Sequence, residues 1–426
     1  MSMEYFVSME IGGRQVPVGS IAGERAEAAC FRYAADYLER TDAAAISVRL
    51  PLQTEPFTTR QTRTFFESLL PEGFTRRSIA TFLRIDEGDY LGILYALGQE
   101  CMGALRIYRE GDAPQAAYVP LTPEQVRLLA AEGAPESTTL VTEAHLSLGG
   151  ASGKVGLYYD AASGAWYLPR GTAPSTHILK QSHVRYEKIV PNEQLCLRTA
   201  ALCGLRVAES RAINTGTGQD RELLLAVRRY DRIFPPSPER ISGLPVPQLL
   251  HQEDFGQALG IPASEKYEHG QHYLRAMFTL LRERSARPIE DQTELWDRIV
   301  FDWLIGNTDA HIKNFSLLYA PDLRSVRLAP AYDMIHTGYK GLSRNMALAI
   351  GGVYPIAEIT RESFHLAARE VGLGEKMALS RFDRMVSRFR PALEKAAAEL
   401  QREGLDGAAE WKNRILQSAG RALADR

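Results

Sequence analysis

The chain has 426 residues, which is too long for one compact core and indicates two or three domains of roughly 100 to 200 residues each. Apolar residues make up 45% of the sequence and charged residues 24%, a balance that excludes a disordered or fibrous chain. The 50 basic and 52 acidic residues leave a formal charge of −2. No overall field therefore draws the chain to nucleic acid or to an anionic membrane.

Three domains are expected. Residues 1–138 should form a small N-terminal α/β domain with a connector, residues 139–236 a β-rich lobe, and residues 237–426 a mainly helical lobe. The last boundary is marked by Pro235, Pro236 and Pro238. A β-rich lobe followed by a helical lobe predicts a cleft between them, where nucleotides and cofactors often bind.

Apolar spacing and turn residues predict the elements of each domain. In the N-terminal domain they are a strand at 46–52 and helices at 60–70, 90–97 and 122–132. In the β-rich lobe they are strands at 155–159, 165–168, 177–180, 208–214 and 222–227, and one helix at 192–202 that Gly204 should end. In the helical lobe they are helices at 273–282, 294–304, 364–371, 375–400 and 408–423, and a strand pair at 316–319 and 326–328.

Three features of the sequence indicate where in the cell the protein is located. Residues 1–12 lack the basic flank and unbroken apolar stretch of a signal peptide. The longest weakly polar run, residues 346–357, falls short of the ~20 residues that a membrane helix needs. The cysteines form none of the close pairs of zinc or redox motifs; they are Cys30, Cys101, Cys196 and Cys203. We expect a cytoplasmic protein that does not enter a membrane, with no chemistry assigned to its cysteines.

The polar loop at residues 306–315 is the sharpest chemical feature, because it lies between two apolar runs and such loops often hold active sites. Asp309 and Asn314 are five positions apart, the interval at which a kinase catalytic loop places its base and its metal-binding amide. Asp309 would accept the proton of an attacking hydroxyl, and the Asn314 oxygen could coordinate Mg²⁺. The same spacing is common by chance, so it needs support from other motifs.

Three charged residues extend this pattern. Asp333, in an apolar segment, is placed to chelate Mg²⁺ that bridges nucleotide phosphates; a helix cap or a structural salt bridge is the alternative. Lys180 ends a predicted strand and resembles in kind the kinase lysine that contacts the α and β phosphates; a solvated lysine is the alternative. Glu193, early in the next helix, is the expected ion-pair partner of Lys180.

A glycine-rich segment, residues 147–154, precedes a predicted strand. Its backbone amides can approach phosphate oxygens, and the expected contacts come from Gly149, Gly150, Ala151, Ser152, Gly153 and Lys154. It is not a Walker A loop, because a strand follows where a helix should begin. Taken alone it could be a hairpin turn. However, glycine loop, lysine, glutamate, hinge, D-x-x-x-x-N and second aspartate occur in the order that a kinase needs.

With these motifs the sequence resembles the HipA family, the kinase toxins of bacterial type II toxin–antitoxin pairs, over nearly its whole length. The supporting segments are residues 69–73, 97–104, 147–154, 176–180, 229–232, 251–255, 306–316 and 332–333. The resemblance implies an α+β, two-lobed protein-kinase-like fold beside the N-terminal domain. It also implies ATP- and Mg²⁺-dependent phosphorylation of Ser or Thr on a protein.

The resemblance assigns roles to individual residues. Asp309 matches the catalytic base, Asn314 and Asp333 the metal ligands, and Lys180 the lysine that contacts phosphate. Further nucleotide contacts are expected from Val227, Arg229, Tyr230 and His311.

The glycine-rich segment also carries an expected modification. Ser147 matches a loop serine that family members autophosphorylate, and about two added negative charges there should repel nucleotide. Ser152 stands where relatives often carry Gln and is a competing phosphosite.

Two departures from the pattern matter. His311 stands where ordinary protein kinases have lysine, and the HipA pattern instead puts a lysine at Lys313. Arg228 stands where many relatives have an acidic residue, which should change the local charge without removing adenine binding, because recognition at a hinge is mostly by the backbone.

The resemblance also implies partners. Family members bind a HipB-like helix-turn-helix antitoxin that contacts the operator, so DNA would be an indirect partner of this near-neutral chain. A protein substrate is expected, with glutamyl-tRNA synthetase as one candidate. Two alternatives stay open: a catalytically idle, nucleotide-sensing co-repressor, and a kinase that acts on a small molecule.

Overall fold

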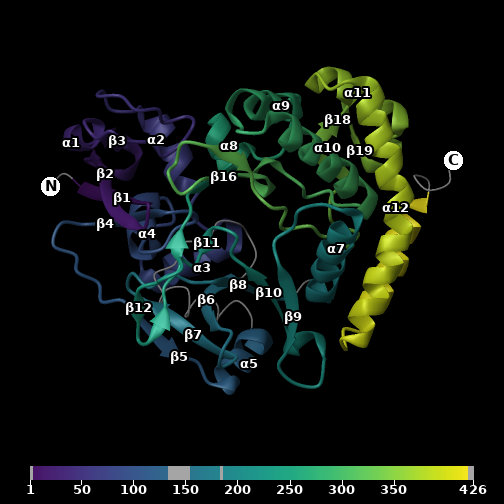
Figure 1. Ribbon diagram of the computed structural model, residues 1–426, viewed down its shortest axis with the longest axis horizontal. Coiled ribbons are helices and arrows are strands. Elements are labelled where there is room, and N and C mark those ends of the chain that lie inside the picture. The colour runs from purple at the N-terminus through teal and green to yellow at the C-terminus, as the bar shows by residue number, and fades with distance from the viewer. Residues whose placement is uncertain (1–2, 133–153, 183–185, 421–426) are drawn as a thin grey trace.

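The structure is a computed structural model that describes residues 3–132, 154–182 and 186–420. Figure 1 places the N-terminal sheet and the long C-terminal helix on opposite sides of the molecule. Helices and antiparallel sheets occur together, so the expected α+β class is confirmed. No helix within the described ranges is long and apolar enough to cross a membrane.

The N-terminal part is a four-stranded sheet with helices packed against it. The strand order is β3 (Cys30–Tyr33), β2 (Arg14–Gly23), β1 (Met3–Ile11) and β4 (Leu105–Tyr108). The helices are η1 (Ala26–Ala28), α1 (Ala35–Leu38), α2 (Thr59–Glu67), α3 (Gly73–Leu83) and α4 (Tyr90–Leu97). The predicted helices at 60–70 and 90–97 are confirmed, and α2 begins at a capping box formed by Thr58 and Gln61.

The strand predicted at 46–52 is wrong, because this segment forms a turn with one isolated bridge between Ser47 and Leu50. Side chains satisfy its backbone groups in place of a strand partner. The Tyr33 hydroxyl accepts from Ile46 N at 2.9 Å and donates to Leu50 O at 2.5 Å. Val48 N donates to Glu253 Oε1 at 3.0 Å. A buried turn is tolerated here since its donors and acceptors are paired.

The second part is a six-stranded sheet with one long helix. The strand order is β5 (Ala117–Pro120), β7 (Ala165–Arg170), β6 (Lys154–Asp160), β8 (His177–Gln181), β10 (Leu223–Arg228) and β9 (Ser210–Asn214). The helices are α5 (Pro123–Glu132), η2 (Asp220–Glu222) and α7 (Ile189–Cys203). The five predicted strands and the helices at 122–132 and 192–202 are confirmed. The edge strand β5 was not predicted, and it lies in the expected connector.

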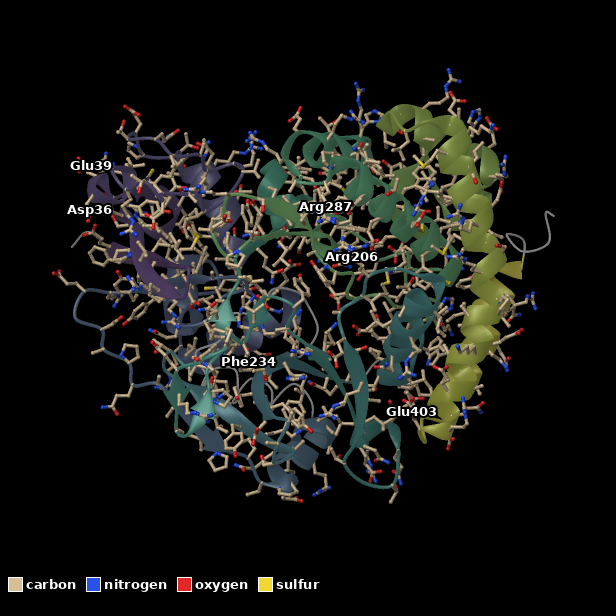
Figure 2. The ribbon with its side chains drawn as sticks, in the orientation of Figure 1. Asp36, Glu39, Arg206, Phe234, Arg287 and Glu403 are labelled. Carbon is tan, nitrogen blue, oxygen red and sulfur yellow. The ribbon has the colours of Figure 1, made fainter. Side chains whose placement is uncertain are left out.

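Helix α7 ends at Gly204, as predicted, because that glycine takes up a left-handed conformation (φ 96°) that accommodates the helix end. The helix packs on β9 and β10 of the sheet and on helices of the third part. Arg198 of α7 contacts Glu399 at 3.1 Å and Glu403 at 3.0 Å, and Figure 2 shows Glu403 at the lower end of the long helix α12. The sheet and the helical part are therefore joined through α7.

The third part is mainly helical. Its helices are α8 (Phe255–Leu259), η3 (Ala263–Glu265), α9 (Tyr273–Arg284), α10 (Pro288–Ile305), η4 (Ile312–Asn314), η5 (Ile356–Glu358), α11 (Arg361–Val371), α12 (Glu375–Arg402) and α13 (Gly407–Ser418). Its strands are β15 (Gln252–Asp254), β16 (Ser316–Tyr319), β17 (Val326–Leu328), β18 (Asn345–Ile350) and β19 (Val353–Pro355). The predicted helices and the strand pair are confirmed, except that α13 ends at Ser418.

The chain between the sheet and the helical part is held by a buried ionic network. Short strand pairs occur in this stretch: β11 (Arg232–Ile233) with β14 (Gln248–Leu249), and β12 (Arg240–Ile241) with β13 (Leu244–Pro245). Glu100 of the N-terminal part contacts Arg229 at 3.1 Å and Arg232 at 2.7 Å. Asp231 contacts the same two arginines at 2.8 and 3.1 Å. The two acids offset the two arginines in charge, so the network fixes the hinge against the N-terminal part.

Candidate active site

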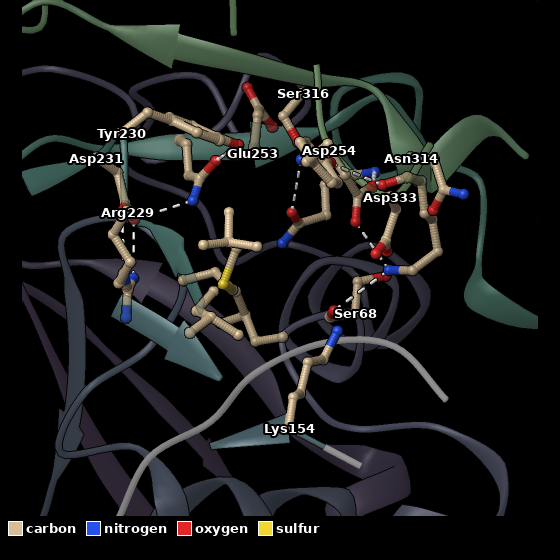
Figure 3. A pocket seen from close by; sticks show the side chains of 18 of the residues that line it. Ser68, Lys154, Arg229, Tyr230, Asp231, Glu253, Asp254, Asn314, Ser316 and Asp333 are labelled. Atoms are coloured by element: carbon tan, nitrogen blue, oxygen red, sulfur yellow. Dashed lines mark hydrogen bonds and ion pairs between the residues drawn. The ribbon is translucent and has the colours of Figure 1, made fainter. Parts of the chain in front are cut away.

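A cleft lies where the three parts of the chain meet, and Figure 3 shows side chains that line it. The second part contributes Lys154, Ile178, Lys180 and Val227, and the hinge contributes Arg228, Arg229, Tyr230 and Asp231. The helical part contributes Gln252, Glu253, Asp254, Gln257, His311, Lys313, Asn314, Ser316, Tyr332 and Asp333. The N-terminal part contributes Ser68, Leu69, Glu72 and Met102.

Lys180 forms a buried charge cluster with two carboxylates. Its Nζ lies 2.6 Å from Glu193 Oε1 of α7 and also pairs with Asp333 Oδ1. The predicted partner Glu193 is thus where the helix was expected to put it. Asp333 has a left-handed backbone (φ 53°), a conformation that is uncommon for a residue other than glycine and that tends to occur at functional sites. The cluster therefore brings together strand β8 with Lys180, helix α7 with Glu193, and Asp333 of the helical part.

The pKa values in this cluster follow from burial and from charge. Burial raises the pKa of Asp333, but Lys180 and Lys154 outweigh it, and the pKa lies below its ordinary value. Burial lowers the pKa of Lys180, but Asp333 and Glu193 outweigh it and the pKa is raised. Burial also raises the pKa of Glu193, against the attraction of Lys180. Asp333 and Lys180 are therefore a stable ion pair at neutral pH.

The loop after α10 brings Asp309 and Asn314 together. Helix α10 ends at Gly306 with φ 72°, and the turn is tied by Asn307, whose Nδ2 donates to Asp302 Oδ1 at 2.9 Å and whose Oδ1 accepts from Asp309 N at 3.2 Å. Asn314 Nδ2 donates to Asp309 O at 2.9 Å. Since the amide nitrogen of Asn314 is used inside the loop, its oxygen is the atom that remains for a cation.

Asp309 does not line this cleft itself, but its backbone oxygen accepts from Asn314, which does. Its side chain is exposed, and its Oδ1 accepts from the Tyr267 hydroxyl at 2.6 Å. Partial burial raises the pKa of Asp309, while the bond from Tyr267 and the nearby Lys266 lower it. A carboxylate that is reachable and held in this way is suited to accept a proton.

His311 lines the cleft as a neutral imidazole. Burial and then the charge of Lys266 lower the pKa of His311 to about 3. Its Nδ1 and the hydroxyl of Ser68 are buried without a hydrogen-bond partner among the residues that the structure describes. Buried polar atoms are nearly always paired in native proteins, so these two atoms fit a polar ligand in the cleft.

The three predicted hinge residues line the cleft in different ways. Val227 lies in β10, one residue before its end. The Tyr230 hydroxyl donates to Gln252 Oε1 at 2.5 Å, and its ring stacks on Tyr332 with centroids 6.0 Å apart. The Arg229 guanidinium is instead used in the buried network with Asp231 and Glu100. Its side chain therefore has a structural task, and its backbone N–H is used as well, because it donates to Thr176 O at 2.9 Å.

The glycine-rich segment cannot be placed in this geometry. Lys154 is its first described residue, and it points into the cleft (Figure 3). Burial lowers the pKa of Lys154, although Asp333 opposes the change. The other predicted contacts lie outside the described residues; they are Ser147, Gly149, Gly150, Ala151, Ser152 and Gly153.

Several residues of the cleft were not predicted as site residues. Lys313 Nζ donates to Asp254 Oδ2 at 2.8 Å and to Ser68 O at 3.2 Å. Glu72 lies 2.6 Å from Lys266 and 3.8 Å from Lys313. Glu72 and Asp254 lie in segments 69–73 and 251–255, which carry the family resemblance. That membership is the sequence signal that could have indicated them.

A strand lysine paired with a helix glutamate, a D-x-x-x-x-N loop and a second aspartate around one interlobe cleft define a protein-kinase-like fold. Comparison with known proteins specifies the class further. The HipA-like C-terminal domain matches residues 146–393, and the HipA N-terminal domain matches residues 9–108. The chain therefore belongs to the HipA family.

Individual relatives agree with this assignment. The chain is 35% identical over 384 residues to a Sinorhizobium fredii protein named "Putative kinase Y4mE", covering 87% of each. It is 27% identical over 394 residues to the "Serine/threonine-protein kinase toxin HipA" of Shewanella oneidensis, covering 86% of this chain and 85% of the relative. A chain of the solved Shewanella complex of HipA, HipB and operator DNA superposes with a TM-score of 0.79 at 22% identity, covering 97% of both chains. The predicted family and fold are thus confirmed.

Proposed function

We propose that this protein is an ATP- and Mg²⁺-dependent serine/threonine-protein kinase and the toxin of a HipBA-type toxin–antitoxin pair. The observation that carries the proposal is one connected site: Lys180, Asp333 and Asn314 line the cleft, Glu193 pairs with Lys180, and Asp309 is hydrogen-bonded to Asn314. Relatives that are named as kinases support it.

In this proposal the residues divide the work of phosphoryl transfer. Lys180, Lys154 and the segment 149–153 hold the phosphates of ATP, and Asp309 accepts the proton of the attacking hydroxyl. Val227, Arg229, Tyr230 and His311 line the rest of the nucleotide site.

The donor set fits Mg²⁺ held together with nucleotide. Asn314 and Asp333 supply two oxygen ligands, and Mg²⁺ usually takes few protein ligands and completes its shell with phosphate and water. Within the described ranges no group of three or more His, Cys, Asp or Glu is arranged to hold a metal ion by itself. When bound, Mg²⁺ would neutralise charge on the transferring phosphate.

Mass spectrometry tests the proposal. The purified protein is incubated with Mg·ATP beside Asp309→Asn, and intact mass and peptides are measured. We expect a phosphate on Ser147, with Ser152 as the alternative, and none in the variant. If a correctly folded protein labels neither itself nor any protein of a cell lysate, the kinase proposal fails and a nucleotide-sensing co-repressor takes its place.

We also propose a HipB-like helix-turn-helix antitoxin as partner, through which the protein co-represses its own operon. The likeness to a chain of the Shewanella complex supports this, and the formal charge of −2 agrees with DNA contacts supplied by the antitoxin. Gel-shift assays of operator DNA with antitoxin alone and with both proteins test it. The substrate class is a protein, and glutamyl-tRNA synthetase is the first candidate to assay.

A further inference from the structure

Tyr267 belongs to none of the sequence motifs, but its hydroxyl is hydrogen-bonded to the carboxylate of Asp309. It lies between η3 and α9, and its hydroxyl donates to Asp309 Oδ1 at 2.6 Å. The side chain is 39% exposed, so packing in the core does not account for its position. A hydrogen bond to an ionised carboxylate is about twice as strong as a neutral one, and it fixes the carboxylate plane.

Tyr267 is itself fixed by two other parts of the chain. Its ring meets the His311 imidazole edge-on, with centroids 5.4 Å apart and planes at 85°. The preceding residue, Lys266, is paired with Glu72 of the N-terminal part at 2.6 Å. Lys266 Nζ also lies 5.4 Å from the Tyr267 ring centroid. The tyrosine is thus braced by the catalytic loop and by the N-terminal part.

We propose that Tyr267 is a positioning residue for the general base: it holds Oδ1 of Asp309 so that Oδ2 receives the proton of the acceptor hydroxyl. Oδ2 has no hydrogen-bond partner among the described side chains and backbone groups, which leaves it available. This inference rests on the proposed kinase function. In the step, the acceptor O–H proton moves to Oδ2, the acceptor oxygen bonds to the γ-phosphorus, and the bond to the bridging oxygen breaks, so that ADP leaves with that electron pair.

Two considerations indicate that the Tyr267 hydroxyl orients the Asp309 carboxylate and does not block it. A carboxylate has two oxygens, and a donor on one leaves the other for the substrate. A general base must also lie within hydrogen-bond reach of its proton in a defined direction, and small misplacements of reacting groups reduce rates strongly. Since Asp309 is exposed and, within the described part of the chain, Tyr267 is the one side chain that donates to its carboxylate, loss of the hydroxyl should free the carboxylate to rotate.

Tyr267→Phe tests the inference, because it removes the hydroxyl and keeps the ring. We expect kcat for phosphoryl transfer to fall roughly 10-fold, with KM for ATP unchanged. Tyr95→Phe is the matched control, because the Tyr95 hydroxyl also donates to a carboxylate, Asp112 at 3.3 Å, in the N-terminal part. The control should leave kcat and KM unchanged. An unchanged kcat in Tyr267→Phe overturns the inference, and an increased kcat overturns it in favour of a blocking hydroxyl.

A second measurement does not depend on activity. We place 3-fluorotyrosine at position 267 and record its ¹⁹F resonance in the otherwise native protein and with Asp309→Asn. A changed resonance in the variant supports the contact, and an identical resonance overturns it. If the native protein transfers no phosphate, the kinase proposal fails while this result still decides whether Tyr267 holds Asp309.

Discussion

Removing the charge of Lys180 should destabilise the protein in a pH-dependent way. Lys180→Met keeps the length of the side chain and leaves Glu193 and Asp333 without their shared cation. The side chains of Lys180 and Glu193 are 10% and 6% exposed, and that of Asp333 is 32% exposed. Removing one partner of a buried ion pair costs about 3–5 kcal/mol. Because solvent screens Asp333, we expect the lower end, about 3 kcal/mol at pH 8 without nucleotide.

The sign of the pH dependence follows from the two carboxylates. In the variant Asp333 loses the attraction of Lys180 and keeps the weaker one of Lys154, and Glu193 loses its ion-pair partner, so the pKa of both buried acids rises relative to the native protein. A carboxyl with a raised folded pKa costs stability when pH lies above that pKa, and the cost shrinks as pH falls and the group is protonated. The loss of stability should therefore be largest at pH 8 and smaller near pH 5.

Urea unfolding followed by circular dichroism at both pH values measures the effect. The control is Lys395→Met, since Lys395 pairs with Glu399 at 3.9 Å on the surface of α12 and is 64% exposed. That variant should stay within about 0.5 kcal/mol of the native protein at either pH. A loss below about 1 kcal/mol for Lys180→Met, or an equal loss at pH 5 and pH 8, would refute the reasoning.

Three other variants test separate parts of the site. Asp309→Asn should abolish phosphoryl transfer while calorimetry finds ATP affinity nearly unchanged, because it removes the base and leaves the phosphate contacts; continued turnover would reject Asp309 as the base. Asp333→Ala should weaken Mg·ATP binding about 10-fold or more, and an unaltered affinity would make Asp333 structural. Burial raises the pKa of Glu253 from 4.5 to about 7, so the native protein should lose stability as pH rises through that range. Glu253→Gln should flatten this slope in thermal unfolding, and an unchanged slope would exclude Glu253 as its source.

The sequence predicted those elements whose signals are local. The helix at 192–202 has an apolar face and a glycine stop, and it is present as α7. The strands β1 and β2 were missed, although in β1 the apolar Val7, Met9 and Ile11 alternate with the polar Ser8 and Glu10, which is the pattern of a strand. At 46–52 Ile46 and Leu50 are buried but Leu52 is exposed, and hydrogen bonds with the side chains of Tyr33 and Glu253 hold the segment as a turn.

The distinction between local and long-range signals also applies to the site residues. Asp309 and Asn314 lie in one short loop, so their spacing predicts that they meet. Tyr267 and Glu72 could not be predicted in this way. Glu72 and Lys266 are 194 positions apart, and the pairing depends on how the N-terminal part packs against the helical part. A single sequence carries no periodic signal for such a contact.

At the hinge, a side chain that was expected to bind nucleotide is used by the structure. Arg229 was expected at the nucleotide site, and it does line the cleft, but its guanidinium is 1% exposed and paired with Glu100 and Asp231. Asp231 also accepts from Gly103 N at 3.1 Å. Replacing one member would leave a buried charge unpaired. The N-terminal part thus meets the cleft at two ends, through Glu100 at the hinge and Glu72 at the catalytic loop, and the geometry of the kinase cleft depends on it.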